Sequence, residues 1–512
     1  MLKTESYKKG IVVSTILNVF GKGIGFLNTL IIAFYFGASS GTDIYFYILS
    51  VAVLITSTIN GIDYLVIIPQ SMKLREQINE NESQKFVNFF VYSYVFIGVI
   101  IAFAGITFPV FLYTLFSKYD FSILKNNYSL LYLGSLIIMF QLINNLLSAV
   151  LTSYRFFTAS IFSGLVNSVF SILFTVFFHH SLGITGTLLG ITFGYIINFS
   201  LLIYFLKHYQ KWDFKAVSFM KDKIVWKNIG LMQINILPVW VRSYFTLYFL
   251  TGMGVGIITS LNLAQMLSSL PEIFILTQIS SIVGIKFSEL AARKDIQMTN
   301  ILLTQVIKSL FLLIIPIALI MAIANKEIIQ LVFQRGNMQQ TSISITRFCF
   351  FYFALLLPSK VLDVLFSRLF TSYQIYGIST LFAFIAHSII TVILYLLTTH
   401  FQLKGYFFTL LIGYYIVMPI TFLMILKYKL SQIKTRLLIK ETLILFTIGG
   451  AVYLIAAFIF DLMIINNIVK ILLLGFMVGT LFILLANWFL DLKEQKNIIK
   501  NLFSKQLNSN RS

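Results

Sequence analysis

The sequence predicts an all-α polytopic membrane protein with about fourteen transmembrane helices. Three observations predict this class: an apolar composition, apolar runs long enough to cross a bilayer, and basic residues that concentrate in alternate connections. Of the 512 residues, 58% are hydrophobic and only 11% are charged, whereas a soluble domain is about half apolar and a quarter charged. One soluble core cannot bury so much apolar surface, so lipid must cover it. Lipid leaves every backbone N–H and C=O to be paired within the chain, which favours helices.

The apolar runs are roughly twenty residues long and are bounded by charged or turn residues, as transmembrane helices are. Continuous runs exclude an outer-membrane barrel, whose strands alternate apolar and polar residues. In chain order the runs centre on Leu17, Thr56, Gly98, Met139, Phe170, Thr192, Val239, Phe274, Leu313, Leu356, Ile389, Ile416, Ile455 and Met477.

Basic residues concentrate in every second connection between these runs. With the N-terminus inside, the cytoplasmic segments include the lysine-rich stretch 207–227 and the basic tail 491–512, while the opposite connections hold few basic residues, such as Lys118 and Lys404. Because cytoplasmic loops carry the excess of Lys and Arg, we expect both termini in the cytoplasm and the protein in a bacterial cytoplasmic (inner) membrane. These loops also account for the net charge of +20, and we expect no nucleic-acid partner.

The lysine-rich stretch divides the chain and predicts its organisation into domains. We expect an N-terminal six-helix lobe and a second six-helix lobe, as in transporters built from repeats, followed by a helix pair. The expected segments are lobes at 1–206 and 228–426, the linker 207–227 between them, the helix pair 427–490 and the tail 491–512.

A weak internal repeat supports the division into lobes. The first two helices are joined by Gly37–Gly41 (Gly-Ala-Ser-Ser-Gly), and the seventh and eighth by Gly252–Gly256 (Gly-Met-Gly-Val-Gly). Each junction follows a helix that carries a basic residue, Lys22 in the first and Arg242 in the seventh. The pattern favours two halves of common design.

Lys22 and Arg242 are candidate ligands for a phosphate group inside the membrane. A charge at the centre of a spanning helix costs roughly 2.5 to 3.5 kcal/mol on insertion, so such residues face a bundle interior or a watery cavity. Lys22 lies among glycines that let a ligand approach closely, and the guanidinium fork of Arg242 suits a diphosphate. The alternative interpretation for both is a structural ion pair, for Lys22 with Asp63 or Glu272.

Three further basic residues fall within the predicted spans, and each has a structural interpretation. Lys360 and Asp363 are one helical turn apart, which predicts that they pair with each other. Lys308 and Arg347 lie near helix ends, where long basic side chains can extend to the interface. The chain has no phosphate-binding P-loop and no nucleophile elbow, so we expect a transporter that is not an enzyme, with no cofactor and no metal.

Two stretches resemble a known family. The first runs from Gly25 and Phe26 through Gly37, Thr42 and Asp43 to Pro69, which closes the predicted second helix. The second is Leu331–Gly336, which includes Arg335 and is followed by Thr346, Pro358 and Phe370. Together they resemble the MviN/MurJ family of lipid II flippases, within the multidrug/oligosaccharidyl-lipid/polysaccharide (MOP) exporter superfamily.

The resemblance implies two six-helix lobes around a central cavity, with two C-terminal helices bordering a groove for a polyprenyl tail. It implies a flippase that moves a polyprenyl-diphosphate-linked glycan to the outer leaflet by alternating access, with that anionic lipid and membrane lipids as partners. We expect a monomer, driven by an ion or by the membrane potential. The cargo is expected to be lipid II or an exopolysaccharide or O-antigen unit.

The sequence departs from the family at its cavity cations. The family's first-helix arginine pair falls on Lys22 and Asn28, and its second-helix pair falls on Thr56 and Ser57. The expected substrate-binding residues are therefore Lys22, Asn28, Asp63, Arg242 and Glu272. Fewer cations favour a lipid-linked glycan other than lipid II. The rival function is a cation-coupled multidrug (MATE-like) antiporter, for which Asp43, Asp63 and Glu272 would supply the acidic groups.

Overall fold

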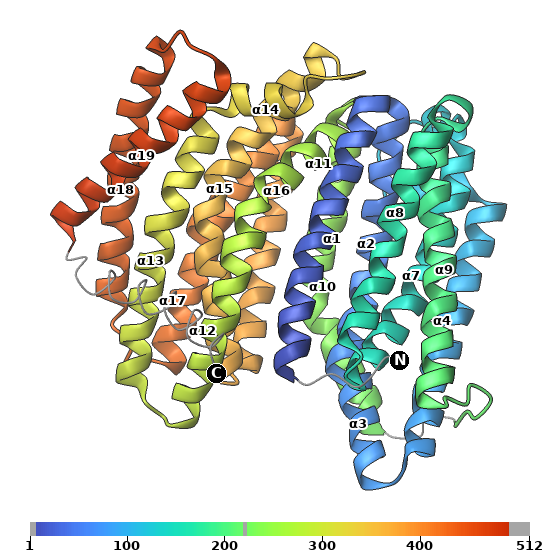
Figure 1. Cartoon of the computed structure of the whole chain (residues 1–512). Coiled ribbons are helices and arrows are strands. Elements are labelled where there is room, and N and C mark those ends of the chain that lie inside the picture. Colours follow the sequence, from blue (N-terminus) through green and yellow to red (C-terminus); the bar gives the residue numbers. More distant parts are fainter. Residues whose placement is uncertain (1–6, 219–222, 491–512) are drawn as a thin grey trace. The chain divides into compact units, whose positions relative to one another are not determined.

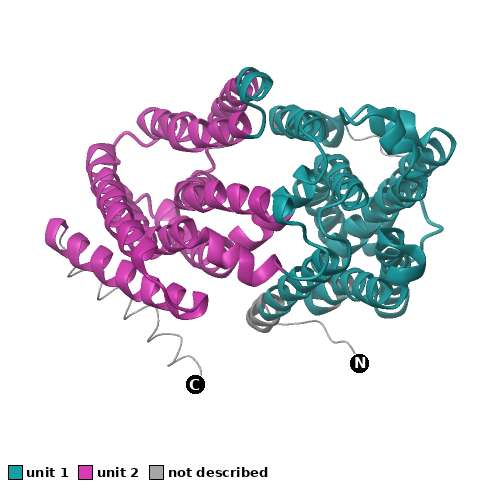
Figure 2. Ribbon diagram, turned by 90° about the horizontal axis from the view of Figure 1, so that it is seen from above, with its two compact units in different colours: residues 1–262, 335–342, 394–403 teal, residues 263–334, 343–393, 404–512 magenta. Residues whose placement is uncertain are grey.

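The computed structural model describes residues 7–218 and 223–490, and all regular secondary structure in these ranges is helical (Figure 1). Two compact units divide the chain, and each gathers segments that are distant in the sequence (Figure 2). Unit 1 comprises 1–262, 335–342 and 394–403, and unit 2 comprises 263–334, 343–393 and 404–512.

Unit 1 is built around α7, which packs against α2, α4 and α9. Helices α8 and α9 form an antiparallel pair whose backbones approach closely, because a Cβ on Gly194 would meet the Cα of Asn167 at 2.6 Å. The helices of this part are α1 (Tyr7–Phe36), α2 (Ser40–Ile62), α3 (Ile68–Gln77), α4 (Glu80–Thr107), α5 (Pro109–Thr114), α6 (Phe121–Lys125), α7 (Tyr128–Ser153), α8 (Phe157–Leu182), α9 (Ile184–Gln210) and α10 (Lys223–Thr251).

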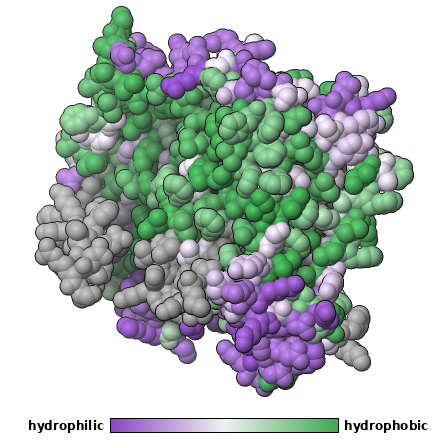
Figure 3. Space-filling view, turned by 45° about the vertical axis from the view of Figure 1, so that its right-hand side comes forward, coloured by the Kyte–Doolittle hydropathy of each residue, from purple (hydrophilic) through white to green (hydrophobic). Residues whose placement is uncertain are grey.

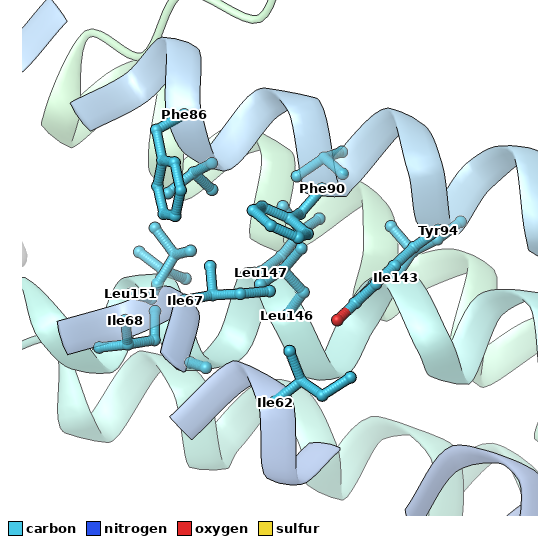
Figure 4. Close-up of a cluster of buried hydrophobic side chains, with 14 of the residues drawn as sticks. Ile62, Ile67, Ile68, Phe86, Phe90, Tyr94, Ile143, Leu146, Leu147 and Leu151 are labelled. Atoms are coloured by element: carbon cyan, nitrogen blue, oxygen red, sulfur yellow. The ribbon is translucent and has the colours of Figure 1, made fainter. Parts of the chain in front are cut away.

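An apolar cluster fills the space where α2, α4 and α7 meet in unit 1 (Figure 4). Phe86, Phe90 and Tyr94 project from α4, and Leu146 and Leu147 project from α7. They enclose the end of α2 and the π-helical turn η1 (Asp63–Ile67) that follows it. We call this set the α2–α4–α7 cluster.

Unit 2 holds most of the second half of the chain. Helices α18 and α19 pack on each other and on α13, and α14 packs against α13 and α19. Helices α11 and α15 begin in unit 1 and continue into unit 2, and residues 394–403 of α16 belong to unit 1. The helices are α11 (Ile257–Ser268), α12 (Thr277–Ala292), α13 (Ile296–Ile323), α14 (Asn325–Phe333), α15 (Gln340–Ser372), α16 (Tyr376–Ile412), α17 (Met418–Lys429), α18 (Thr435–Leu462) and α19 (Asn467–Phe489).

Two of the three π-helical turns in the described ranges are followed by a proline. Pro69 follows η1, and Pro419 follows the turn η3 (Gly413–Val417). A proline has no N–H and its ring clashes with the carbonyl four residues earlier, so the ladder widens by one residue at that point. The helical stretch therefore does not close at Pro69, as the sequence pattern had predicted, but runs on to Gln77.

The predicted number of spans is accounted for by one bend and one break. Twelve helices in the described ranges are long and apolar enough to cross a membrane, and the bent helix α10 raises the number to thirteen. One of the twelve is a stretch of 53 residues, Gly377–Lys429, about twice what a bilayer needs. Gln402 breaks it with non-helical dihedral angles (φ 48°, ψ −125°). Counting its two halves separately gives the predicted number, about fourteen.

Side-chain polarity agrees with a membrane location. Figure 3 shows apolar residues across the middle of the visible face and polar residues gathered toward two opposite ends. Largely exposed apolar side chains such as those of Leu454, Phe476 and Trp488 belong to α18 and α19. In water such surfaces would aggregate, whereas in a bilayer they contact lipid.

Candidate functional site

The turn between α1 and α2 carries the residues of the first family-like stretch. Ser39 caps α2: its hydroxyl accepts a hydrogen bond from the Thr42 N–H (3.3 Å), and the Thr42 hydroxyl accepts one from the Ser39 N–H (2.7 Å). This reciprocal capping box satisfies backbone donors that the first turn of a helix leaves open. Gly25 accepts a hydrogen bond from Thr29 within α1, and Phe26 is half-buried on the same helix.

Asp43 reaches from α2 to a helix more than two hundred residues later. Its carboxylate accepts hydrogen bonds from the N–H of Gly256 (2.5 Å), the N–H of Thr259 (2.8 Å) and the Thr259 hydroxyl (2.6 Å). Its side chain is 1% exposed. Asp43 therefore caps the N-terminus of α11, where free N–H groups and the helix dipole favour a negative charge.

Three glycines with positive φ surround the same turn: Gly37 (φ 60°), Gly256 (φ 85°) and Gly336 (φ 61°). A Cβ on Gly37 would overlap the Asn337 carbonyl, and a Cβ on Gly336 would overlap the Phe34 carbonyl. The Asn337 N–H donates to the Phe34 carbonyl at 2.9 Å. We call Gly37, Gly256 and Gly336 the three-glycine cluster. Gly37 and Gly336 belong to the two family-like stretches, and Gly37 and Gly256 belong to the two glycine junctions of the predicted repeat.

The neighbouring Arg335 is exposed and makes no ion pair with any described residue.

Three of the five basic residues predicted within spans have protein partners. Lys308 is 7% exposed and forms an ion pair with Glu441 at 3.5 Å. The Arg347 guanidinium donates to the side chain of Asn325 at 2.5 Å. Lys360 lies over the ring of Tyr414, 4.8 Å from its centroid. The prediction that Lys308 extends to the interface is therefore wrong, because a partner on α18 holds it inside unit 2.

Lys22 and Arg242 differ from these three. Within the described part of the chain, neither forms an ion pair within 4.0 Å or a side-chain hydrogen bond. Lys22 is exposed and Arg242 is half-buried. A Cβ on Gly23, beside Lys22, would meet no atom within 4 Å. The alternative interpretation, an ion pair of Lys22 with Asp63 or Glu272, is not formed in this structure.

The other predicted site residues lie in varied surroundings. Asn28 accepts a hydrogen bond from the buried Ser171 hydroxyl at 3.0 Å, which joins α1 to α8. Asp63 is fully buried in the α2–α4–α7 cluster and accepts a hydrogen bond from the Tyr94 hydroxyl at 2.6 Å. Glu272 is half-buried at the start of the π-helical turn η2 (Glu272–Leu276). Glu272 lies in unit 2, and the other four predicted substrate-binding residues lie in unit 1.

Two buried ion pairs were not predicted from the sequence. Besides Lys308 and Glu441, Lys470 at the start of α19 pairs with Glu327 of α14 at 3.5 Å. Their partners are far apart in the chain, so no local spacing reveals them. The only available signal was the presence of Lys and Glu within otherwise apolar helices.

The described helices are long and apolar enough to cross a membrane and carry ionisable groups, which defines the class as a polytopic, all-helical membrane protein. The sequence model of the family described as lipid II flippase MurJ matches residues 32–481. The chain therefore belongs to the MurJ family.

Individual relatives agree with this assignment. The chain is 24% identical over 386 residues to the probable lipid II flippase MurJ of Borreliella burgdorferi, which covers 72% of each protein. A solved structure of lipid II flippase MurJ in an inward closed conformation has a TM-score of 0.71 at 19% identity, covering 92% of this chain and 98% of that one. An inward-facing MATE transporter of the MOP superfamily has a TM-score of 0.65 at 13% identity, covering 81% and 96%. These likenesses show the MOP exporter fold.

Proposed function

We propose that this protein carries a polyprenyl-diphosphate-linked glycan from the cytoplasmic to the outer leaflet of the inner membrane. Family membership supports flipping of a lipid-linked glycan, because the relatives named above are lipid II flippases. Lipid II and an exopolysaccharide or O-antigen unit share the chemistry that matters here, namely a diphosphate between a polyprenyl tail and a sugar.

The observation that carries the proposal is the difference between the basic residues within the spans. Lys308, Arg347 and Lys360 have partners inside the protein. Lys22 and Arg242 have no acidic partner among the described residues. A cation without a partner in a spanning helix is costly and marks a substrate path. A diphosphate would supply the missing charge, bidentate on Arg242 and as a point contact on Lys22.

Alternating access of the two lobes that the sequence predicts, 1–206 and 228–426, would deliver this cargo. The distribution of basic residues among the connections predicts that the α1–α2 turn lies on the outer side of the membrane. In this mechanism the hydrogen bonds of Asp43 and the close contacts of the three-glycine cluster keep the outer end of unit 1 closed. Cargo binds at the cytoplasmic side, and release requires these contacts to separate. The tail stays in lipid throughout, so the protein shelters only the polar headgroup.

The membrane potential can drive the outward step. Moving one elementary charge across 100 mV is worth about 2.3 kcal/mol. Two negative charges leaving a negative interior would therefore gain about 4 to 5 kcal/mol. Such a flippase needs no nucleotide.

The test is flipping of a fluorescent polyprenyl-diphosphate-linked glycan in proteoliposomes, read by accessibility to a reagent that cannot cross the membrane. Lys22→Gln and Arg242→Gln should each slow flipping at least tenfold, since a charge-assisted contact is worth about 1.5 to 3 kcal/mol. Lys73→Gln, which removes an exposed charge from α3, should leave the rate unchanged. Wild-type rates in both span variants would refute the assigned role.

The same variants separate the proposal from the drug antiporter. Similarity to MATE structures at 13% identity concerns the fold alone. If this protein exports cationic drugs, and if the Lys22→Gln variant still exports them, the protein is an antiporter. A chain that moves only the diphosphate-linked lipid would be a flippase.

A further inference from the structure

Asp63 is a carboxyl group that the proposed flipping step does not use. Its side chain is fully buried on the η1 turn, which the α2–α4–α7 cluster encloses. One carboxyl oxygen, Oδ1, accepts the hydrogen bond from Tyr94. The other, Oδ2, is buried and has no hydrogen-bond partner. Figure 4 shows the Tyr94 hydroxyl directed from α4 toward the helix that carries Ile62.

No basic side chain in the described ranges forms an ion pair with this carboxyl group within 4.0 Å. Helix α7 carries no charged residue, and the nearest titratable neighbours are the tyrosines Tyr94 and Tyr64. None of the charged side chains on the other helices packed against the turn forms an ion pair with Asp63 within 4.0 Å; these are Lys73, Arg75 and Glu76 of α3, Glu80, Glu82 and Lys85 of α4, and Lys223, Lys227 and Arg242 of α10. Two of these residues, Lys85 and Glu82, form an ion pair with each other.

An ionised carboxylate in such surroundings would be severely destabilised. It would lose its hydration by water and would receive in exchange a single hydrogen bond, with no cation to balance its charge. The neutral acid avoids that cost. It keeps the bond from Tyr94, since a protonated carboxyl group still accepts at its second oxygen.

We propose that Asp63 is a proton-binding site: it holds a proton in the conformation described here and releases it when the η1 turn moves and water reaches the carboxyl group. The ligand is a proton and not a metal ion, because no other carboxylate, and no group of three or more metal-binding side chains, accompanies Asp63 in the described ranges. The coupling of this proton to transport rests on the proposed function; the binding itself does not.

The backbone provides a reason for movement at this point. Asp63 is the first residue of the π-helical turn η1, which Pro69 follows two residues after its end, and π turns inside α-helices often occur at functional sites. On the preceding turn, Gly61 lies tightly against Met232 and Ile236 of α10. A shift of α10 would therefore press on the turn that carries Asp63. Unpacking it would break the Tyr94 bond and admit water to both oxygens.

The binding is tested without any substrate, by infrared spectroscopy of the purified protein. A protonated carboxyl group has a carbonyl-stretch band that the carboxylate lacks. We expect such a band in the wild type at neutral pH, its loss in Asp63→Asn, a frequency shift in Tyr94→Phe, and no change in Asp120→Asn. Asp120 is an exposed aspartate of the same unit. A spectrum that is identical in the wild type and Asp63→Asn would overturn the proposal.

The coupling is tested in proteoliposomes with the potential clamped and a pH gradient imposed, using the fluorescent diphosphate-linked glycan. For one proton exchanged per cycle, each pH unit should shift the leaflet ratio about tenfold in the wild type. The ratio should not respond in Asp63→Asn, which is locked in the neutral form. An equal response in both proteins would overturn the coupling. A wild type that shows the infrared band but flips no glycan would refute the proposed function and leave the proton site standing.

Discussion

Asp43 and Thr259 are joined by two hydrogen bonds to a single oxygen: Asp43 Oδ1 accepts from the Thr259 N–H at 2.8 Å and from its hydroxyl at 2.6 Å. Asp43 Oδ2 accepts from Gly256. All three hydrogen bonds are made by the buried Asp43 carboxyl group. This group therefore fixes the position of the N-terminus of α11 relative to α2.

Removing the Asp43 side chain should destabilise the protein by about 3 kcal/mol or more, because two backbone N–H groups and a hydroxyl lose their acceptor. Thr259→Val removes only the hydroxyl and should cost about 1 kcal/mol. Thermal unfolding in detergent measures both. Equal melting temperatures for Asp43→Ala and the wild type would show that the hydrogen bonds contribute nothing.

Adding a methyl group to the three-glycine cluster should also destabilise the protein. Gly37→Ala and Gly336→Ala each place a Cβ against a backbone carbonyl, and each alanine must adopt the positive φ of the glycine that it replaces. That backbone conformation alone costs a non-glycine residue roughly 1 to 2 kcal/mol. Gly479→Ala is the matched control, because it adds a Cβ in open space inside α19. It should leave stability unchanged or raise it by up to about 1 kcal/mol. The prediction fails if all three variants melt together.

The Lys308–Glu441 pair should behave as a unit. Replacing either residue alone, as in Lys308→Met or Glu441→Gln, breaks this buried ion pair and should cost about 3 to 5 kcal/mol. The double variant Lys308→Met/Glu441→Leu should recover most of that loss. A double-mutant cycle on unfolding free energies measures the coupling, and strictly additive losses would contradict a direct interaction.

The break at Gln402 can be tested by cysteine labelling. Cys349, the single native cysteine, is fully buried. Gln402→Cys in spheroplasts should react with a maleimide that cannot cross the membrane, whereas Lys73→Cys should react only after permeabilisation. If Gly377–Lys429 were one continuous span, residue 402 would lie in the bilayer and remain unlabelled.

The sequence was most informative about features that depend on local composition. Apolar run length located the helices, and Gly37–Gly41 and Gly252–Gly256 correctly marked two junctions. Pro69 misled, because a proline can be accommodated by a π turn as well as by a helix end. Lipid supplies the apolar surroundings of every span, so the pattern fixes where helices lie without fixing which of them touch.

The candidate site was harder to predict from the sequence for the same reason. That Asp43 caps a helix starting at Ile257, or that Glu441 neutralises Lys308, depends on tertiary packing between helices far apart in the chain. Lys308 and Lys22 look alike in the sequence, each a lysine in an apolar helix. Only the presence of a partner for one and its absence for the other, among the described residues, separates a structural cation from a candidate ligand.

The two ion pairs also join the last two helices to the rest of unit 2. Lys308 and Glu327 are 7% and 8% exposed, and their partners belong to α18 and α19. A truncation after α17 would remove both partners at once, so that Lys308 would lose the carboxylate of Glu441 and Glu327 would lose the ammonium group of Lys470. The C-terminal hairpin is therefore not a detachable appendage. A twelve-helix ancestor or a shortened engineered form would need apolar residues at both positions before it could do without the hairpin.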